Sequence, residues 1–289
     1  MARKLDGKWA AKEIRRELRG RVDTLVEHGV RPKLSLIRVG EDPASVVYVR
    51  TKERASAKVG IESEVLVLPE DATEARIAEE IDRRVADTAV HGLLLQLPLP
   101  GGLDPTPLLY RIDPAKDVDG FHPFNIGMLC LGEPTFVPCT PLGILELLAR
   151  HGVEVEGRHV AIVGRSTTVG RPLANLLSLK RPGGDAAVSI VHSRTASPER
   201  ITREADLVVA AAGRRGLVTA EWIAPGAAVV DVGIHRTEDG SLHGDVEAAS
   251  VGEVAGWLSP VPGGVGPMTV ACLLANTVRA AEEQNRKKG

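Results

Sequence analysis

The apolar positions of the first hundred residues switch repeatedly between helical and strand-like spacing. Apolar side chains between Trp9 and Leu25 recur on one helical face, and Gly29 is typical of the residue that follows a helix end. Three short apolar runs are typical of buried strands and occupy residues 33–39, 63–69 and 92–100. The pattern therefore predicts one amphipathic helix followed by three strands.

Helix signals separate these strands. Asp42 followed by Pro43 is typical of a helix start, because the carboxylate accepts hydrogen bonds from the first amide groups and proline suits the first turn. This helix is expected to end at Gly60, and another is expected to begin near Thr73. Apolar strands that alternate with helices indicate an α/β fold with a parallel sheet covered on both faces.

The second half of the chain repeats this organisation. A helix over residues 141–152 is followed by five apolar runs, at 159–164, 186–193, 205–213, 227–233 and, more weakly, near Trp257. We expect a second, Rossmann-like doubly wound parallel sheet there. The predicted domains are residues 1–139 and 140–266, with a final helix over 267–289 that packs back on the first domain.

Composition narrows the class of protein. The chain has 289 residues, of which 43% are hydrophobic, and a formal net charge of −2, so it has no overall basic character that would favour nucleic acid. No run approaches the roughly 18 apolar residues of a membrane span, and the first residues lack the apolar segment of a signal peptide. We therefore expect a cytoplasmic protein without nucleic-acid or membrane partners.

The cysteines indicate the same compartment. Cys130, Cys139 and Cys272 are odd in number and widely spaced, which favours reduced thiols over a disulfide framework or a zinc site. Cys139 is interpreted as a small buried residue in preference to a nucleophile. No metal site is expected.

A candidate nucleotide-binding loop follows the strand at 159–164. The sequence continues from Gly164 through Arg165 and Ser166 and reaches Gly170 at the start of the next helix. Glycine lets a backbone approach a pyrophosphate closely, and a helix N-terminus attracts its charge. Because the spacing differs from Gly-x-Gly-x-x-Gly, a tight turn without a ligand stays an alternative.

The end of the next strand bears on the choice of dinucleotide. A cofactor without a 2′-phosphate usually meets an Asp or Glu there, but residues 192–194 read His-Ser-Arg. The Ser193 hydroxyl and the Arg194 guanidinium suit a phosphate monoester, and Arg165 offers a second cation. The pattern favours NADP if a dinucleotide binds, with a solvated surface role for Arg194 as the alternative.

Three polar residues stand out in the first half. Tyr48 and Lys52 lie four residues apart inside a predicted helix and so share one face. Gln96 interrupts the apolar run "LLLQLPLP" near the carboxyl end of its strand, where open α/β sheets place their ligands. A buried amide without partners costs about 1–3 kcal/mol. Gln96 therefore bonds either a neighbouring loop or a functional group.

Two further segments have constrained backbones. In "KDVDG", Asp117 and Asp119 do not form a calcium loop, because Ala115 and Ile126 occupy two of the required ligand positions. These acids either cap a turn or hold the paired N–H donors of a heterocycle. The run "PVPGGVGPMT" over 260–269 brings bare backbone close to another group and is expected to start a helix at Pro267.

Six segments, in order along the chain, resemble one enzyme family. They read "SVVYVRTKERASAKVGI", "GLLLQLPLP", "KDVDGFHPFNIGMLCLG", "PCTPLG", "VGRSTTVGRP" and "SPVPGGVGPMT". Together they resemble the bifunctional methylenetetrahydrofolate dehydrogenase/cyclohydrolase family over residues 5 to 280. The combination of these motifs is far more specific than any one glycine-rich loop.

The resemblance implies two reactions in one cleft between two α/β domains. NADP+ takes hydride from 5,10-methylenetetrahydrofolate, and water then opens the resulting 5,10-methenyl cation to 10-formyltetrahydrofolate. Residues 1–139 and the final helix would be the folate-binding catalytic domain, and residues 140–266 the NADP-binding domain. The resemblance also implies a homodimer formed through the nucleotide-binding domain.

The resemblance assigns roles to individual residues. Lys52 matches the residue of proton chemistry, Gln96 the glutamine that tunes it, and Tyr48 the ring that lies along the folate. Asp119 matches the residue that holds the pterin. The folate site is also lined by Gly264 and Pro267. The implied cofactor-binding residues are Gly164, Arg165, Ser166, Gly170, Ser193, Arg194 and Ile234, with Ser193 near the 2′-phosphate.

The sequence departs from the family in two places, and two other functions stay open. "SLKRPGGDAAVS" is longer than usual, and His235 stands where the family more often has Asn. One alternative is another two-domain NADP-dependent dehydrogenase, in which Lys52 and Asp119 form the acid–base pair. The other is a non-catalytic NADP-binding regulator. The first alternative leaves Gln96 and the Pro/Gly-rich run unexplained, and the retention of Lys52 with Tyr48 and Gln96 speaks against the second.

Overall fold

The computed structural model describes residues 1–286, which form two compact units. Within the described residues, the three-stranded unit comprises 12–128, 134–139 and 270–286. The six-stranded unit comprises residues 1–11, 129–133 and 140–269. Each unit contains its own parallel sheet, so the expected α/β class with two sheets is confirmed.

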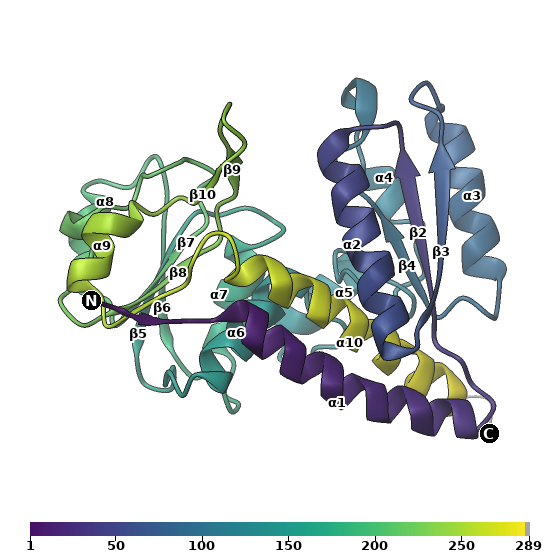
Figure 1. The fold of residues 1–289 in the computed structure, drawn as a ribbon, viewed down its shortest axis with the longest axis horizontal. Coiled ribbons are helices and arrows are strands. Elements are labelled where there is room, and N and C mark those ends of the chain that lie inside the picture. The colour runs from purple at the N-terminus through teal and green to yellow at the C-terminus, as the bar shows by residue number, and fades with distance from the viewer. Residues whose placement is uncertain (287–289) are drawn as a thin grey trace. The chain divides into compact units, whose positions relative to one another are not determined.

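In the three-stranded unit, a small parallel sheet lies between two helices. Its strand order is β3-β2-β4, with β2 at Lys33–Val39, β3 at Glu62–Leu68 and β4 at Gly92–Leu95. Helices α2 (Pro43–Val59) and α3 (Glu74–Ala86) lie on opposite sides of this sheet (Figure 1). Buried side chains of α3 and of the strands, such as Ile77, Ile37 and Leu93, form a common core.

The ends of α2 are fixed by the residues that the sequence singled out. The Asp42 carboxylate accepts a hydrogen bond from the Ser45 amide at 2.7 Å, and Pro43 occupies the first helical turn. Gly60 ends the helix with a φ of 85°, a left-handed conformation that glycine adopts without steric cost. These predicted limits are confirmed. They matter for function because they set where Tyr48 and Lys52 lie.

Shorter elements and part of a long helix complete this unit. They are the 3-10 turn η1 (Pro100–Gly102), α4 (Thr106–Leu109) and most of α5 (Pro123–Cys130). The later residues of α10 (Val265–Arg286) also belong to it. The Asn276 amide of α10 donates to the carbonyl oxygens of Val118 at 2.8 Å and Val137 at 3.2 Å. The helix is thus bonded to Val118 within the "KDVDG" turn and to Val137 after it.

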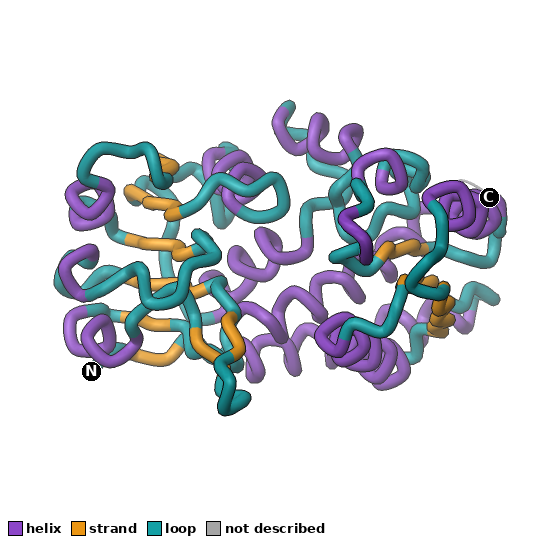
Figure 2. The backbone as a smooth tube through the Cα atoms, turned by 90° about the horizontal axis from the view of Figure 1, so that it is seen from above, coloured by secondary structure: helices purple, strands orange, loops and turns teal. Residues whose placement is uncertain are grey.

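The six-stranded unit has the doubly wound architecture expected of the second half. Its strand order is β1-β11-β8-β7-β5-β6, and all five pairings are parallel. The bounds are β1 Arg3–Lys4, β5 His159–Val163, β6 Ala187–Val191, β7 Leu207–Ala210, β8 Ala228–Asp231 and β11 Trp257–Leu258. Figure 2 shows these strands as a stack with helices on both sides.

The helices of this unit cover both faces of the sheet through alternating strand residues. Ala161 and Val163 of β5 pack with one core cluster that also contains Val251. The helices are α6 (Cys139–Arg150), α7 (Gly170–Ser178), α8 (Pro198–Arg203) and α9 (Ala248–Val254), with the 3-10 turn η2 (Ala220–Trp222). A small antiparallel pair, β9 (His235–Arg236) and β10 (Leu242–His243), follows β8.

Several expectations from the pattern are wrong in detail. The strand predicted over 92–100 ends at Leu95, because Pro98 and Pro100 lack the amide hydrogen that a sheet requires. The final helix begins at Val265 instead of Pro267. Trp9 is 47% exposed, so its ring does not join the buried stripe of α1 (Gly7–Glu27). The ring instead contacts the His151 ring edge-on at 5.1 Å.

The division into units also differs from a simple split of the chain. Residues 1–11 belong to the six-stranded unit, where β1 forms the sixth strand, and residues 270–286 belong to the three-stranded unit. The assignment of folate and NADP binding to the two domains stays a prediction. Within residues 1–286, no helix has the length and apolar character needed to cross a membrane.

Candidate active site

A direct hydrogen bond joins two of the predicted catalytic residues. The Lys52 ammonium on α2 donates to the Gln96 side-chain oxygen at 2.9 Å. Gln96 follows β4 directly, at the carboxyl end of the sheet, and its amide nitrogen donates to the Leu97 carbonyl at 2.7 Å. Both ends of the buried amide are therefore satisfied. The amide bonds a neighbouring loop and a functional group at the same time.

The surroundings of Lys52 favour its neutral form. Burial lowers the pKa of the Lys52 ammonium, because a charged amine loses hydration inside the protein. Two acidic neighbours, Asp119 and Cys139, oppose this shift and raise the pKa without cancelling it. A lysine with a lowered pKa exchanges protons at neutral pH more readily than an ordinary surface lysine.

The two acids of "KDVDG" have different roles. Asp117 holds a turn, because its carboxylate accepts from the Gly120 amide at 3.1 Å, the His122 amide at 2.8 Å and the Asn125 side chain at 2.8 Å. Asp119 lies near Lys52. Burial raises the pKa of the Asp119 carboxyl, and the nearby Lys52 ammonium opposes that rise. Asp117 therefore fits the turn interpretation, and Asp119 stays available for a ligand.

Tyr48 and Cys139 complete the surroundings of this lysine. Tyr48 lies one helical turn before Lys52 and is 40% exposed, so part of its side chain is open to a ligand. Cys139 is buried, and burial together with the Asp119 carboxylate raises the pKa of its thiol well above the usual value. Its thiol donates to the Val118 carbonyl at 3.3 Å. The interpretation of Cys139 as a buried residue is confirmed.

The glycine-rich loop of the six-stranded unit requires glycine at both predicted positions. Gly164 has a φ of 128°, and a Cβ there would lie 2.1 Å from the Ala211 carbonyl oxygen. A Cβ at Gly170 would lie 2.3 Å from the Gly164 carbonyl oxygen. The loop between β5 and α7 therefore leaves its backbone bare at the carboxyl end of the sheet.

Polar side chains cluster around this loop. The Ser166 hydroxyl accepts from the amides of Val169 at 3.1 Å and Gly170 at 3.4 Å and so caps the start of α7. Arg165 is exposed. Ser193 and Arg194 are exposed in the turn that follows β6, next to β5 in the sheet. Bare backbone, a helix N-terminus and two arginines suit the phosphates of a dinucleotide.

A small pocket brings together three other predicted residues. Ile234, Gly264 and Pro267 line a cavity of about 170 Å³ beyond the carboxyl ends of β8 and β11. Ile234 is 48% exposed, and its side chain reaches the position that a Cβ on Gly266 would contact. The Pro/Gly-rich run therefore forms one wall of a real pocket in the six-stranded unit.

Two buried carboxylates beside this pocket were not foreseen from the sequence. Asp231 accepts from the amides of Gly233 at 3.0 Å, Asp245 at 2.9 Å and Val246 at 3.1 Å. The Asp245 carboxylate accepts from the amides of residues 212 and 213 and bonds the His235 ring at 2.7 Å. Burial raises the pKa of Asp231 to about 6. An acid that directly follows the apolar run "AVV" was the available signal.

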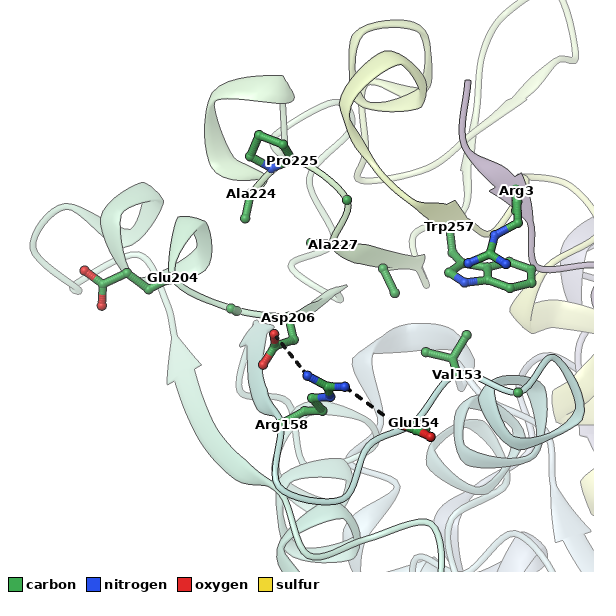
Figure 3. A pocket seen from close by; sticks show the side chains of 14 residues that line it. Arg3, Val153, Glu154, Arg158, Glu204, Asp206, Ala224, Pro225, Ala227 and Trp257 are labelled. Atoms are coloured by element: carbon green, nitrogen blue, oxygen red, sulfur yellow. Dashed lines mark hydrogen bonds and ion pairs between the residues drawn. The ribbon is translucent and has the colours of Figure 1, made fainter.

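A larger hollow lies at the opposite end of the same sheet. It measures about 480 Å³ and is lined by residues that include Arg3, Arg158 and Trp257. Figure 3 shows Arg158 between Glu154 and Asp206, at 3.5 Å and 4.0 Å, and Arg3 against the Trp257 ring, 4.0 Å from its centre. No predicted site residue lines it. Open α/β sheets bind ligands at the carboxyl ends of strands, so this amino-end hollow is not part of the candidate site.

Two domain families match the sequence. Residues 5–119 match the tetrahydrofolate dehydrogenase/cyclohydrolase catalytic domain. Residues 138–285 match the NAD(P)-binding domain of the same enzymes. Together the two matches cover almost the whole chain and agree with the resemblance noted from the motifs.

Named relatives and solved structures support the same family. The bifunctional protein FolD 1 of Rubrobacter xylanophilus is 51% identical over 281 residues, which are 97% of this chain and 98% of that protein. The crystal structure of FolD from Campylobacter jejuni has a TM-score of 0.94 at 42% identity and covers 98% of this chain and 99% of its own.

A third relative has been solved with ligands. The Trypanosoma brucei methylenetetrahydrofolate dehydrogenase-cyclohydrolase, complexed with NADP and an inhibitor, has a TM-score of 0.92 at 40% identity and covers 99% of both chains. With the domain matches and the first two relatives, it shows that this chain belongs to the bifunctional tetrahydrofolate dehydrogenase/cyclohydrolase family.

Proposed function

We propose that this protein oxidises 5,10-methylenetetrahydrofolate with NADP+ and hydrolyses the product to 10-formyltetrahydrofolate, with Lys52 as the proton carrier. The observation that supports this role is the 2.9 Å hydrogen bond from the Lys52 ammonium to buried Gln96. A surface lysine would gain little from such a contact. Here burial lowers the pKa of the amine, and Gln96 fixes the amine in place.

The hydrolytic step needs a group that both takes and gives a proton. Water adds to the cationic bridge carbon of the methenyl group and loses a proton. The carbon–N5 bond then breaks as the hydroxyl on that carbon loses its proton and becomes the formyl C=O, and N5 gains a proton. Water has thus lost two protons and N5 has gained one, so one proton is released overall. We assign the transfers to Lys52, because its amine is a base when neutral and an acid when protonated. Gln96 accepts from the ammonium and so directs it.

We assign folate binding to residues around this lysine and to the Pro/Gly-rich run. The Asp119 carboxylate suits the paired N–H donors of the pterin. The half-exposed ring of Tyr48 suits a stacked ligand ring. The bare backbone at Gly264 and the rigid Pro267 line a pocket wall.

The cofactor is assigned to the six-stranded unit. Its phosphates would be held by the loop of Gly164 and Gly170, by Ser166 at the start of α7 and by the Arg165 guanidinium. The Ser193 hydroxyl and the Arg194 guanidinium would bind the 2′-phosphate, and Ile234 would contact the rest of the dinucleotide. When bound, NADP+ supplies a hydride acceptor. What the protein contributes is position, because hydride transfer needs two rings held face to face.

We also propose that two copies associate through the six-stranded unit. Strand β6 lies at the edge of that sheet, and its Ile190 side chain is 38% exposed. Edge strands with apolar side chains readily pair with another chain. A cytosolic location, expected from the cysteines, stays a prediction.

The proposed activity is tested with purified protein in two assays. Protein mixed with 5,10-methenyltetrahydrofolate should remove the near-ultraviolet absorbance of that compound faster than buffer does. Protein mixed with 5,10-methylenetetrahydrofolate should reduce NADP+ and favour it over NAD+, because Ser193 and Arg194 replace the usual acid. Activity in neither assay would contradict the proposal. A clear preference for NAD+ would contradict only the assigned 2′-phosphate site.

A further inference from the structure

A buried lysine lies three residues before Asp119. Lys116 is 7% exposed, and its ammonium donates to the carbonyl oxygens of Arg84 at 3.2 Å, Val85 at 2.7 Å and Asp87 at 2.7 Å. These carbonyls lie at the end of α3, where the last turn has no helical partners and carries partial negative charge. An ammonium has three donors, so the side chain fits this helix end closely.

The main chain of the same residue is bonded to the sheet. The Leu93 amide of β4 donates to the Lys116 carbonyl at 2.8 Å, and residues 93 and 117 form a parallel bridge. A Cβ at Gly92 would lie 2.7 Å from the Val118 side chain, which shows how closely the segment packs on β4. Lys116 thus connects the segment before Asp119 to both a helix and a strand.

A second side chain ties down the same turn. The Gln284 amide of α10 donates to the Ala115 carbonyl at 3.1 Å and to the His91 carbonyl at 2.9 Å. Ala115 lies one residue before Lys116, and His91 one residue before β4. Lys116, from the turn's own sequence, and Gln284, from a helix remote in sequence, thus add to the bonds that Asp117 and Asn276 make with the same turn.

We propose that Lys116 and Gln284 form a brace that positions the Asp119 carboxylate for folate binding and beside Lys52. Neither side chain has to touch the folate for this role, so both are positioning residues. The inference rests on the proposed roles of Asp119 and Lys52. Helix capping by Lys116 would affect stability alone. The proposed brace gives this residue a second role, in the binding site.

The two roles differ in what they do to the site. If the brace holds Asp119, loosening it weakens folate binding. It also removes part of the Asp119 charge from Lys52, and this charge raises the pKa of that lysine. Loss of a helix cap alone would lower the melting temperature and leave both quantities as they are in the unmodified protein.

The test compares Lys116→Met and Gln284→Ala with the matched control Lys33→Met. Lys33 lies in the same sheet, and its ammonium pairs with Glu64 at 2.9 Å. In the full-length protein, tetrahydrofolate affinity is measured by calorimetric titration. The pKa of Lys52 is measured by NMR of lysine labelled with ¹³C at Cε, with its signal assigned by Lys52→Met.

We expect Lys116→Met to weaken tetrahydrofolate binding about tenfold and Gln284→Ala about threefold, with the Lys52 titration moved to lower pH in both. NADP+ affinity should stay within about twofold, and Lys33→Met should match the unmodified protein. A folded Lys116→Met variant with unchanged folate affinity and unchanged Lys52 titration would overturn the proposal. If Lys116→Met does not fold, Gln284→Ala decides by the same two measurements.

Asp119→Ala separates failure of the brace from failure of the binding assignment. If this variant binds tetrahydrofolate as tightly as the unmodified protein, the assigned role of Asp119 is wrong and the brace has nothing to position. If Asp119→Ala binds weakly while both brace variants bind normally, only the brace is wrong.

Discussion

The Lys52 ammonium and the Gln96 amide would each be costly to bury alone. An unsatisfied buried amide costs about 1–3 kcal/mol, and a buried charge costs more. Their mutual hydrogen bond at 2.9 Å offsets part of both costs, and the Leu97 carbonyl satisfies the rest of the amide. The remaining cost appears as the lowered pKa of Lys52, which the proposed chemistry uses.

A second buried residue, Asp231, leads to a prediction about pH and stability. Burial raises the pKa of its carboxyl from 3.8 to about 6 in the folded protein. Between these values the folded state binds more protons than the unfolded state, so this group's contribution to the unfolding free energy falls as the pH rises. The decrease is largely complete above pH 6 and amounts to at most about 3 kcal/mol.

Asp231→Asn should remove this dependence, because the amide does not titrate. Urea unfolding at pH 4.5 and at pH 7 measures the free energy of unfolding of both proteins. Relative to the variant, the unmodified protein should lose stability between the two pH values. What is compared between the two proteins is the change in the free energy of unfolding from pH 4.5 to pH 7. Its absolute value also differs, because the substituted amide loses hydrogen bonds from the backbone. Identical pH dependence in both proteins would show that Asp231 is ionised throughout this range.

At the scale of elements, local signals predicted some limits well and others poorly. The start and end of α2 were predictable because Asp42 and Gly60 act on their own neighbours. Strand β1 was not predictable. It has only two residues, and they form a strand only because they pair with β11, more than 250 positions away. The pattern placed the start of α10 at Pro267, because proline suits the first turn of a helix, whereas the helix begins two residues earlier, at Val265.

The edge strand β6 carries the prediction about association. If two copies pair through it, the unmodified protein should sediment at about twice 30.7 kDa. Ile190→Lys places a charge on this edge and should weaken the dimer at least about tenfold, leaving monomers at low micromolar concentration. Val67→Lys is a matched control, because Val67 is a 44% exposed residue of β3 in the other sheet. Dimers that persist in Ile190→Lys would place the interface elsewhere.

At the scale of the whole molecule, the proposed proton chemistry and the proposed cofactor site fall on separate units. Lys52, Gln96 and Asp119 belong to the three-stranded unit, whereas the glycine-rich loop and Ser193 belong to the six-stranded unit. The two-sheet architecture was predictable from the alternation of apolar runs. The meeting of Lys52 with Gln96, 44 positions later, was not, because it depends on the placement of α2 beside the end of β4. Motif resemblance supplied the roles that periodicity leaves open.

The most direct test of the account is the hydrolysis rate of a Lys52→Met variant. Loss of the near-ultraviolet absorbance of 5,10-methenyltetrahydrofolate is followed in the unmodified protein, in Lys52→Met and in Lys58→Met, an exposed lysine on the same helix. We predict that Lys52→Met slows hydrolysis about 10²-fold or more, while tetrahydrofolate still binds and Lys58→Met keeps the full rate. Hydrolysis by Lys52→Met at the unmodified rate would contradict the account.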